Sequence, residues 1–353
     1  MNLSMKYIYI FVLLFLFSCG TTRQSLIEKE VNSNALINVT HAPTDIRKQL
    51  KTITFGSCND QNKPQPLWTE IEQLDSDLWI WLGDNIYADT GDPKVFQTEY
   101  NKQLANKDYA KFIRNTPVVG TWDDHDFGEN NAGKEFAQKD IAKRWMLDFL
   151  QVPQKAEVRK REGTYQSYTF GKGDTQVKVI LLDSRYFRDA PIRENRVYIP
   201  NETGTILGKA QWKWLENELK NSTAKIHIIA NGIQVLQEEH AYEKWANFPN
   251  ERQHLLDLLV DYQVNMPILL SGDRHIAEFA KMEYKGKPIV EITSSGLTHS
   301  YEELESEPNK YRVGKLITSL NYGCMMIDWS GNKPKVTLQI RGEENKVLDE
   351  MDF

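Results

Sequence analysis

Residues 78–89 read LWIWLGDNIYAD, an apolar run that passes directly into a polar cluster. A short apolar run bounded in this way is typical of a β-strand that is covered on both faces. The polar cluster begins with Gly83 and contains Asp84 and Asn85, whose side-chain oxygens are suitable ligands for cations. The stretch therefore predicts a buried strand that brings chemically useful side chains to one edge of a sheet.

The same pattern recurs along the chain and predicts an α/β fold in one domain. Apolar runs at residues 51–55, 117–120, 177–182, 226–230 and 267–270 end in the clusters GSCND, TWDDHD, DSR, NGIQV and SGDRH. Helical spacing of apolar residues lies between several runs, at residues 64–74, 134–150, 209–219 and 251–262. From about residue 285, the segments IVEITSS, NYGCMMIDW and KVTLQI are expected to be antiparallel strands that extend a second sheet.

Polar side chains at these strand ends predict one shared site. In an open α/β sheet, ligands gather at the carboxyl ends of the strands. Taken singly, an aspartate after a strand is more simply a turn residue, and an isolated histidine is more simply structural. Their recurrence at the same kind of position favours a common site. The candidate residues are Cys58, Asp60, Asp84, Asn85, Asp124, His125, Asp126, Asp273 and His275.

The most acidic of these clusters is TWDDHDFGEN at residues 121–130. Crowded carboxylates disfavour one another's ionisation unless a cation lies among them, so the stretch suggests a metal-binding loop. A polar turn is the simpler alternative, but it accounts for this loop alone and not for its place in the series. Asp123 and Glu129 are expected at a solvated rim.

Five segments in this order resemble the calcineurin-like metallophosphoesterases, and within them the PhoD-like alkaline phosphatase and phosphodiesterase family. The segments are FGSCND, LGDNIYAD, TWDDHDFGEN, LLDSRYFRD and LSGDRHIAEF, and the resemblance covers roughly residues 53–296. It implies a four-layer α/β/β/α sandwich with mixed sheets. It also implies hydrolysis of phosphate monoesters or diesters by a metal-activated hydroxide, with two or more metal ions as cofactors.

The resemblance implies a set of metal ligands. Cys58 takes the first ligand position, where a thiolate suits a softer metal such as iron. Asp84 is the carboxylate expected to bridge two metals, and Asp124, Asp273 and His275 complete the set. The abundance of oxygen ligands is compatible with calcium or another hard divalent cation beside the iron.

Catalytic roles also follow from the resemblance. His125 is expected to protonate the leaving alkoxide or to hold a phosphate oxygen, and Asp126 is expected to orient His125. Arg185 is predicted to contact phosphate, and the alternative is a pairing with Asp183 or Asp189.

Further residues are predicted to contact the substrate or to support the ligands. These are Asp60, Asn85, Tyr87, Asn231 and Gln234, the last two standing where the superfamily usually has a histidine. His299 follows a loop that could border the site and is left open. His227, within an apolar run, is expected to be structural.

The N-terminus predicts an exported bacterial lipoprotein. Residues 7–17 form an unbroken apolar run that is too short to span a membrane and suits a signal peptide. The run ends before Cys19 in a pattern that resembles a lipobox, and an ordinary signal peptide with a chance cysteine is the alternative. We expect a signal peptide at residues 1–18, a lipidated tether at 19–45, and the catalytic domain at 46–353. The protein would face the periplasm or be anchored in the outer membrane.

Composition limits the range of partners. The 43 Lys and Arg residues are balanced by 49 Asp and Glu residues without a basic block, which argues against nucleic-acid binding. The expected partners are a phosphate-ester substrate and a membrane, reached through the anchor. Cys58 and Cys324 could form a disulfide in an exported protein. Two alternatives to a general phosphatase remain, namely a strict phosphodiesterase or phospholipase D-like enzyme and a non-catalytic surface protein that binds phosphate or metal.

Overall fold

The computed structural model describes residues 35–195 and 197–353, of which Leu36–Phe353 form one compact unit. The predicted signal peptide and Cys19 lie outside the described residues, as does most of the predicted tether. The last residues of that tether contact the domain, since the N–H of Ala42 donates to the carbonyl of Ile113 at 2.7 Å. Among the described residues, no helix is both long enough and apolar enough to cross a membrane.

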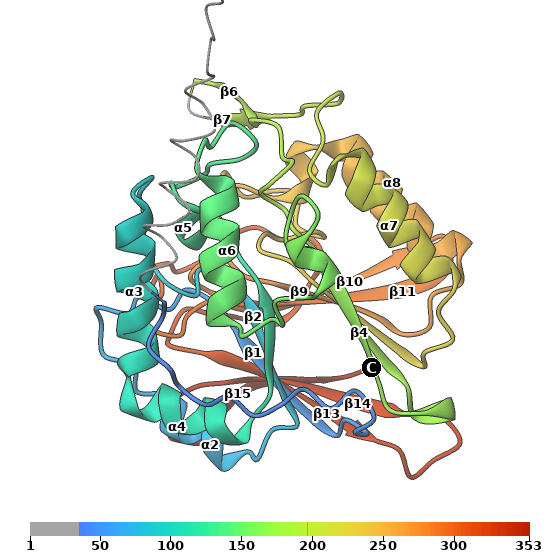
Figure 1. Cartoon of the computed structure of the whole chain (residues 1–353). Helices are drawn as coiled ribbons and strands as arrows, with labels where there is room; N and C mark the ends of the chain where they lie inside the picture. Colours follow the sequence, from blue (N-terminus) through green and yellow to red (C-terminus); the bar gives the residue numbers. More distant parts are fainter. Residues whose placement is uncertain (1–34, 196) are drawn as a thin grey trace, which may run out of the picture. The chain divides into compact units, whose positions relative to one another are not determined.

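Two mixed sheets form the centre of this unit (Figure 1). The first has the strand order β15-β14-β13-β1-β2-β3, and the second has the order β12-β10-β11-β9-β8-β5-β4. The first sheet consists of Thr52–Gly56 (β1), Leu78–Leu82 (β2), Val118–Thr121 (β3), Tyr322–Asp328 (β13), Lys335–Arg341 (β14) and Val347–Asp352 (β15). The second consists of Gln166–Phe170 (β4), Val177–Leu181 (β5), Ile226–Ala230 (β8), Pro267–Ser271 (β9), Ala277–Tyr284 (β10), Lys287–Ser294 (β11) and Arg312–Ile317 (β12). A small hairpin pairs Ile192–Glu194 (β6) with Val197–Ile199 (β7).

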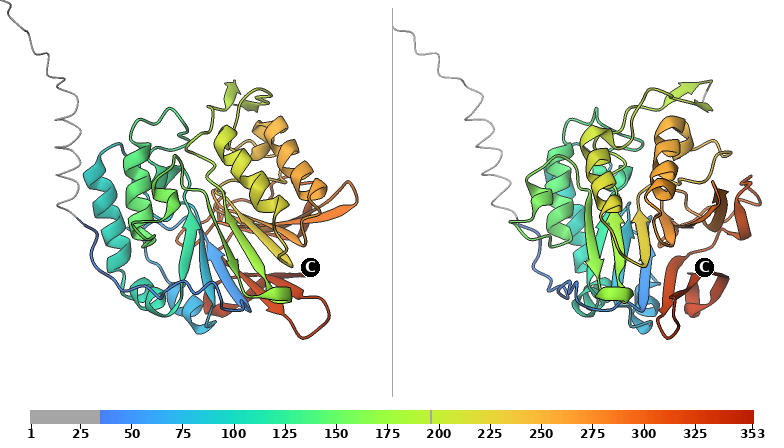
Figure 2. Two further views of the ribbon diagram at one scale, coloured as in Figure 1. Left: turned by 45° about the vertical axis from the view of Figure 1, so that its right-hand side comes forward. Right: turned by 90° about the vertical axis from the view of Figure 1, so that its right-hand side faces the viewer.

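Helices cover the outer face of each sheet, as the views in Figure 2 show. Four of them lie over the first sheet, namely Trp68–Gln73 (α2), Pro93–Ala105 (α3), Lys107–Asn115 (α4) and Lys139–Phe149 (α6). Gly208–Lys220 (α7) and Pro249–Asp261 (α8) pack on the second sheet in a shared apolar cluster. The short helix Asp124–Phe127 (α5) follows β3 directly.

Alternation along β2 shows why the chain forms layers. Leu78, Ile80 and Leu82 enter the core between the two sheets. Trp79 and Trp81 point to the other face, where both pack edge-on against the ring of Trp68 in α2. Successive side chains of a strand alternate between faces, so one fully apolar strand supplies two separate cores. The arrangement confirms the predicted α/β fold with two mixed sheets.

Some predicted elements differ from the observed ones. The helix expected from residue 64 begins at Trp68, the helix expected from residue 134 begins at Lys139, and α3 and α4 were not predicted. The strands β13 and β14 extend the first sheet rather than the second, because the free edge of β1 pairs with β13 in antiparallel register. β11 is antiparallel to β10 but parallel to β9. Cys58 and Cys324 are both free, so the disulfide alternative is wrong.

Candidate metal centre

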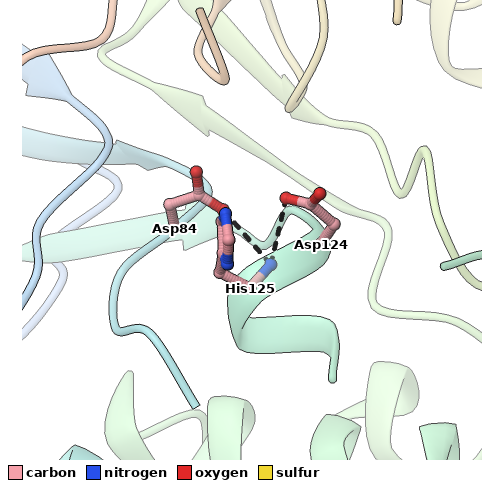
Figure 3. Close-up of side chains that lie close together, drawn as sticks. All are labelled: Asp84, Asp124 and His125. Carbon is pink, nitrogen blue, oxygen red and sulfur yellow. Dashed lines mark hydrogen bonds between the residues drawn. The ribbon is translucent and has the colours of Figure 1, made fainter. Parts of the chain in front are cut away.

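The carboxyl ends of β1, β2, β3 and β9 bring the predicted ligands together. The Sγ atom of Cys58 lies 3.3 Å from Oδ2 of Asp84, which joins the loops after β1 and β2. The backbone N–H of His125 lies 3.4 Å from Oδ1 of Asp84 and 3.0 Å from Oδ1 of Asp124 (Figure 3). Loops that are distant in sequence therefore converge on one small, buried volume.

Two overlapping groups in this volume could hold a cation. Asp84, Asp124 and His125 each offer a ligand atom, and these atoms lie within 4.8 Å of one another. Asp123, Asp124 and Asp273 satisfy the same limit. Asp124 belongs to both groups, so the two positions would adjoin each other.

The backbone at the predicted ligands has an uncommon conformation. The φ angles of Cys58, Asp84, Asp273 and His275 are 58°, 48°, 68° and 52°. For residues other than glycine, such values cost about 1 to 3 kcal/mol each and persist where the surroundings enforce them, often at functional sites. Ten other described non-glycine residues, among them Gln263 and Lys285, have a positive φ as well, so this conformation accompanies the site and does not by itself identify it.

Burial makes this cluster unfavourable for negative charge in the absence of a cation. Burial, with the neighbouring Cys58, raises the pKa of Asp84 well above its usual value. Burial and the carboxylates of Asp123 and Asp124 raise the pKa of Asp273 to about 7. Burial raises the pKa of the Cys58 thiol to about 11. A bound cation would favour the ionised form of all three groups.

Two buried atoms with no partner among the described residues fit a metal or phosphate ligand. One is Nδ1 of His275, whose pKa is lowered to about 4 by burial, so that the imidazole is neutral as a metal ligand must be. The other is Oδ1 of Asn85. Buried polar atoms are normally hydrogen-bonded, so such orphans suggest a missing ligand, and the residues present fit a metal centre.

His125 is oriented by Asp89 rather than by Asp126. Its Nδ1 lies 2.6 Å from Oδ1 of Asp89, and its ring packs 4.1 Å from the ring of Tyr87. Burial lowers the pKa of His125, but Asp84, Asp89 and Asp124 outweigh burial and raise that pKa to about 10. The imidazole therefore has a fixed orientation and a strong tendency to hold a proton.

The prediction that Asp126 orients His125 is therefore wrong, for a local reason. Asp126 is the third residue of α5, so its carboxylate folds back over the helix N-terminus. There it accepts hydrogen bonds from the backbone N–H groups of Asp123, Asp84 and Asn85 at 2.8, 3.2 and 3.3 Å. Asp126 ties the loop after β2 to the loop after β3.

Arg185 is fully buried and is held by carboxylates. Its Nε and one terminal nitrogen donate to the two oxygens of Asp123 at 2.6 and 2.8 Å, and the other donates to Glu243 at 2.7 Å. The predicted alternative partners are wrong, because Arg185 gives Asp183 only its backbone N–H and Asp189 pairs with Lys134. The predicted phosphate contact is wrong as well, because the guanidinium is fully buried and all three of its nitrogens donate to carboxylates. In this arrangement the guanidinium supports the acidic cluster.

Asp123 was expected at a solvated rim, and the structure corrects this. It is fully buried against Arg185, whereas Glu129 is exposed as expected. Sequence alone could not distinguish them, since the burial of Asp123 depends on an arginine that lies 62 residues further along the chain.

Three further predicted residues already have hydrogen-bond partners elsewhere. Asp60 accepts the backbone N–H of Asn62 in a local turn. The side-chain oxygen of Asn231 accepts from Trp245 at 2.9 Å, and that of Gln234 lies 2.8 Å from Nε2 of His240. These amide oxygens are thus engaged away from the acidic cluster.

Tyr87 and His299 border the cluster. The Tyr87 hydroxyl lies 3.4 Å from Oδ2 of Asp84 and 3.2 Å from Nε2 of His299. The position of His299 after the strand-end loop SSGLT was the only sequence signal for it. A cavity of about 340 Å³ opens onto His125, Asp273 and His275 and gives a small molecule access to the cluster.

Known proteins resemble this chain in sequence and in fold. Alkaline phosphatase D of Bacillus subtilis (strain 168) is 25% identical over 64% of this chain, and the chain spans about half (46%) of that relative. The structure of PhoD shares the fold with a TM-score of 0.65 and 16% identity, covering 88% of this chain and 73% of that one. GAP50, the anchor in the inner membrane complex of Plasmodium, has a TM-score of 0.55 at 12% identity, covering 86% of this chain and 89% of its own. The family model for PhoD-like phosphatases matches residues 53–321, and the chain therefore belongs to the PhoD-like phosphatase family.

Proposed function

We propose that this protein is a metal-dependent hydrolase of phosphate monoesters, diesters or both. The observation that carries the proposal is the buried cluster around Asp84 and Asp124, with the paired His125 at its edge and a cavity leading to it. Membership of a phosphatase family supports the reaction class, and the distant relationship to alkaline phosphatase D is consistent with it.

Five residues would hold the metal ions in this proposal. Cys58, Asp84, Asp124, Asp273 and His275 combine a thiol, three carboxylates and an imidazole, a set that suits iron at one position and calcium or another divalent cation at the next. Bound cations would neutralise charge on the phosphoryl oxygens and supply a nucleophilic water at neutral pH.

Residues of the chain itself would donate the proton to the leaving group and keep the metal ligands in position. Asp89 holds Nδ1 of His125, which leaves Nε2 free to donate a proton to the leaving oxygen. The Tyr87 ring packs on that imidazole and restricts its rotation. Arg185 and Asp126 fix the loops that carry Asp84 and Asp124, so the ligands keep their mutual positions.

One set of measurements tests this proposal. Metal content by mass spectrometry and hydrolysis of p-nitrophenyl phosphate and bis-p-nitrophenyl phosphate are compared for wild type, Asp84→Ala and His125→Ala. We expect Asp84→Ala to lose metal and activity, and His125→Ala to keep metal while losing roughly 100-fold or more in kcat. Asp108→Ala, at an exposed position on α4, is the matched control and should behave as wild type. Absence of both bound metal and hydrolysis in the wild type would overturn the proposal.

The same assay separates the alternatives. Hydrolysis of the diester alone would identify a strict phosphodiesterase or phospholipase D-like enzyme. Bound metal without hydrolysis of either ester would indicate a non-catalytic protein that binds metal or phosphate.

We also propose that the protein is exported and anchored through a lipid on Cys19. The apolar run before Cys19 supports this proposal. Labelled palmitate should be incorporated into wild type but not into Cys19→Ser, and incorporation into both would contradict it.

A further inference from the structure

Two exposed tyrosines line the cavity beside the acidic cluster. Tyr242 and Tyr301 are 48% and 41% exposed, and both contribute to the cavity wall. Among the described residues they are the only Phe, Trp or Tyr side chains that are exposed, since all the others are buried or half-buried. Large aromatic surface is usually buried, so two exposed rings at the entrance to a site suggest a contact surface for a ligand.

The loop that carries Tyr242 is held firmly. The next residue, Glu243, bridges the buried guanidinium groups of Arg185 and Arg188. Lys244 is buried and donates to the carbonyls of His240 and Tyr242 at 2.6 and 3.1 Å. These contacts hold the backbone at Tyr242 in place. Little conformational entropy would therefore be lost in this loop when a ligand binds.

A cation further restrains the ring of Tyr242. The guanidinium of Arg274, paired with the buried Glu307 at 2.6 Å, lies 4.0 Å from the centre of this ring. A guanidinium over one face attracts the ring through its quadrupole and fixes its tilt. The ring can then present its remaining surface to the cavity.

Tyr301 connects this surface to the proposed metal centre. Its backbone N–H donates to the carbonyl of His275 at 2.9 Å, and its ring centre lies 5.1 Å from that of His275. The rings of Tyr301 and Tyr242 are 6.4 Å apart and tilted by only 26°. The two tyrosine rings are therefore nearly parallel to each other, and together they form an aromatic surface that begins beside His275, a proposed metal ligand.

We propose that Tyr242 and Tyr301 form an aromatic subsite that binds a planar ring of the substrate, such as a nucleobase, while its phosphate lies at the acidic cluster. This inference rests on the proposed function for the position of the phosphate. Aromatic side chains bind bases by stacking without requiring a particular base, so the subsite selects for a planar ring and not for one compound. A phosphate ester without such a ring would leave this surface uncovered.

A matched pair of substrates tests the subsite. Adenosine 5′-monophosphate and ribose 5-phosphate are esters of the same kind of primary alcohol, and they differ in whether a base is present. We expect wild-type kcat/KM to be about tenfold higher for the nucleotide. Tyr242→Ala and Tyr301→Ala should bring the ratio of the two kcat/KM values close to one. Tyr242→Phe and Tyr301→Phe keep the ring and should keep the preference.

Binding measured by calorimetry distinguishes failure of the subsite from failure of the proposed function. If wild type hydrolyses both esters with equal kcat/KM, or if both alanine variants keep the preference, the subsite is overturned and the phosphatase assignment stands. If neither ester is hydrolysed, the proposed function fails for these esters, and the affinities decide the subsite separately. Tighter binding of the nucleotide that disappears in Tyr242→Ala supports it, and equal binding of both ligands overturns it.

Discussion

Oδ1 of Asp89 lies 2.6 Å from Nδ1 of His125, so a residue of the loop after β2 sets the orientation of the proposed general acid. Asp89→Asn keeps the size of the side chain but removes the charge that favours the imidazolium form. We expect kcat to fall about 10- to 100-fold with unchanged metal content, which steady-state kinetics and mass spectrometry would check. Asp92→Asn, which retains the side-chain oxygen at the N-cap of α3, is the nearby control. Equal kcat in wild type and Asp89→Asn would contradict this role.

Arg185 stabilises the fold by compensating two buried carboxylates. Arg185→Met leaves Asp123 and Glu243 without their shared partner in a site that water does not reach. We expect a loss of about 3 to 5 kcal/mol in the free energy of unfolding, measured with urea. Arg47→Met removes an exposed pair with Asp45 and should leave the unfolding midpoint almost unchanged. Similar midpoints for the two variants would show that the buried network is not stabilising.

Gly232 leaves room for Asp123. A Cβ atom at this position would lie 2.0 Å from Oδ1 of Asp123, closer than any stable contact. Gly232→Ala should displace that carboxylate, lower the free energy of unfolding by about 1 to 3 kcal/mol and reduce metal content. Gly91→Ala, whose added Cβ would lie 3.6 Å from the nearest atom, an ordinary van der Waals distance, serves as the control. Normal metal binding by Gly232→Ala would contradict the steric argument.

His227 gives stability a pH dependence that is separate from the acidic cluster. It lies in β8 with its ring nitrogens 2.8 Å from the Asn265 carbonyl and from the Ser222 hydroxyl, and burial lowers its pKa to about 4. This confirms its predicted structural role. The unfolded chain takes up this proton near its ordinary pKa of 6.5 and the folded chain only near 4, so stability falls as pH falls through that window.

The variant His227→Gln cannot take up this proton. Between pH 6.5 and 4 the wild type should lose up to about 3 kcal/mol more than the variant in the free energy of unfolding. Parallel pH profiles for wild type and His227→Gln would contradict the assignment.

Several features of the site could be predicted from the sequence because they are local. Apolar runs that end in polar clusters located the strand ends, and parallel strands bring such ends to one edge. Cys58, Asp84 and Asp124 were therefore found without knowledge of the fold's details. The alternation of Leu and Trp in β2 likewise follows from a strand covered on both faces.

Other features could not be predicted because they depend on contacts between distant segments. The role of Asp89 depends on which way the imidazole of His125 faces. The burial of Asp123 depends on Arg185, and the place of β13 depends on which sheet edge remained free. The prediction that Asp126 orients His125 failed for a different reason. Asp126 lies in the first turn of α5, where its carboxylate accepts hydrogen bonds from backbone N–H groups.

The central claim is that bound metal is surrounded by Cys58, Asp84, Asp124, Asp273 and His275. Anomalous X-ray scattering from crystals of the purified protein tests this claim most directly. The claim predicts anomalous peaks within coordination distance of these side chains in wild type. It also predicts their loss, together with ester hydrolysis, after chelation and their joint return when metal is restored. Crystals that lack any peak at this cluster while the same preparation hydrolyses phosphate esters would contradict it.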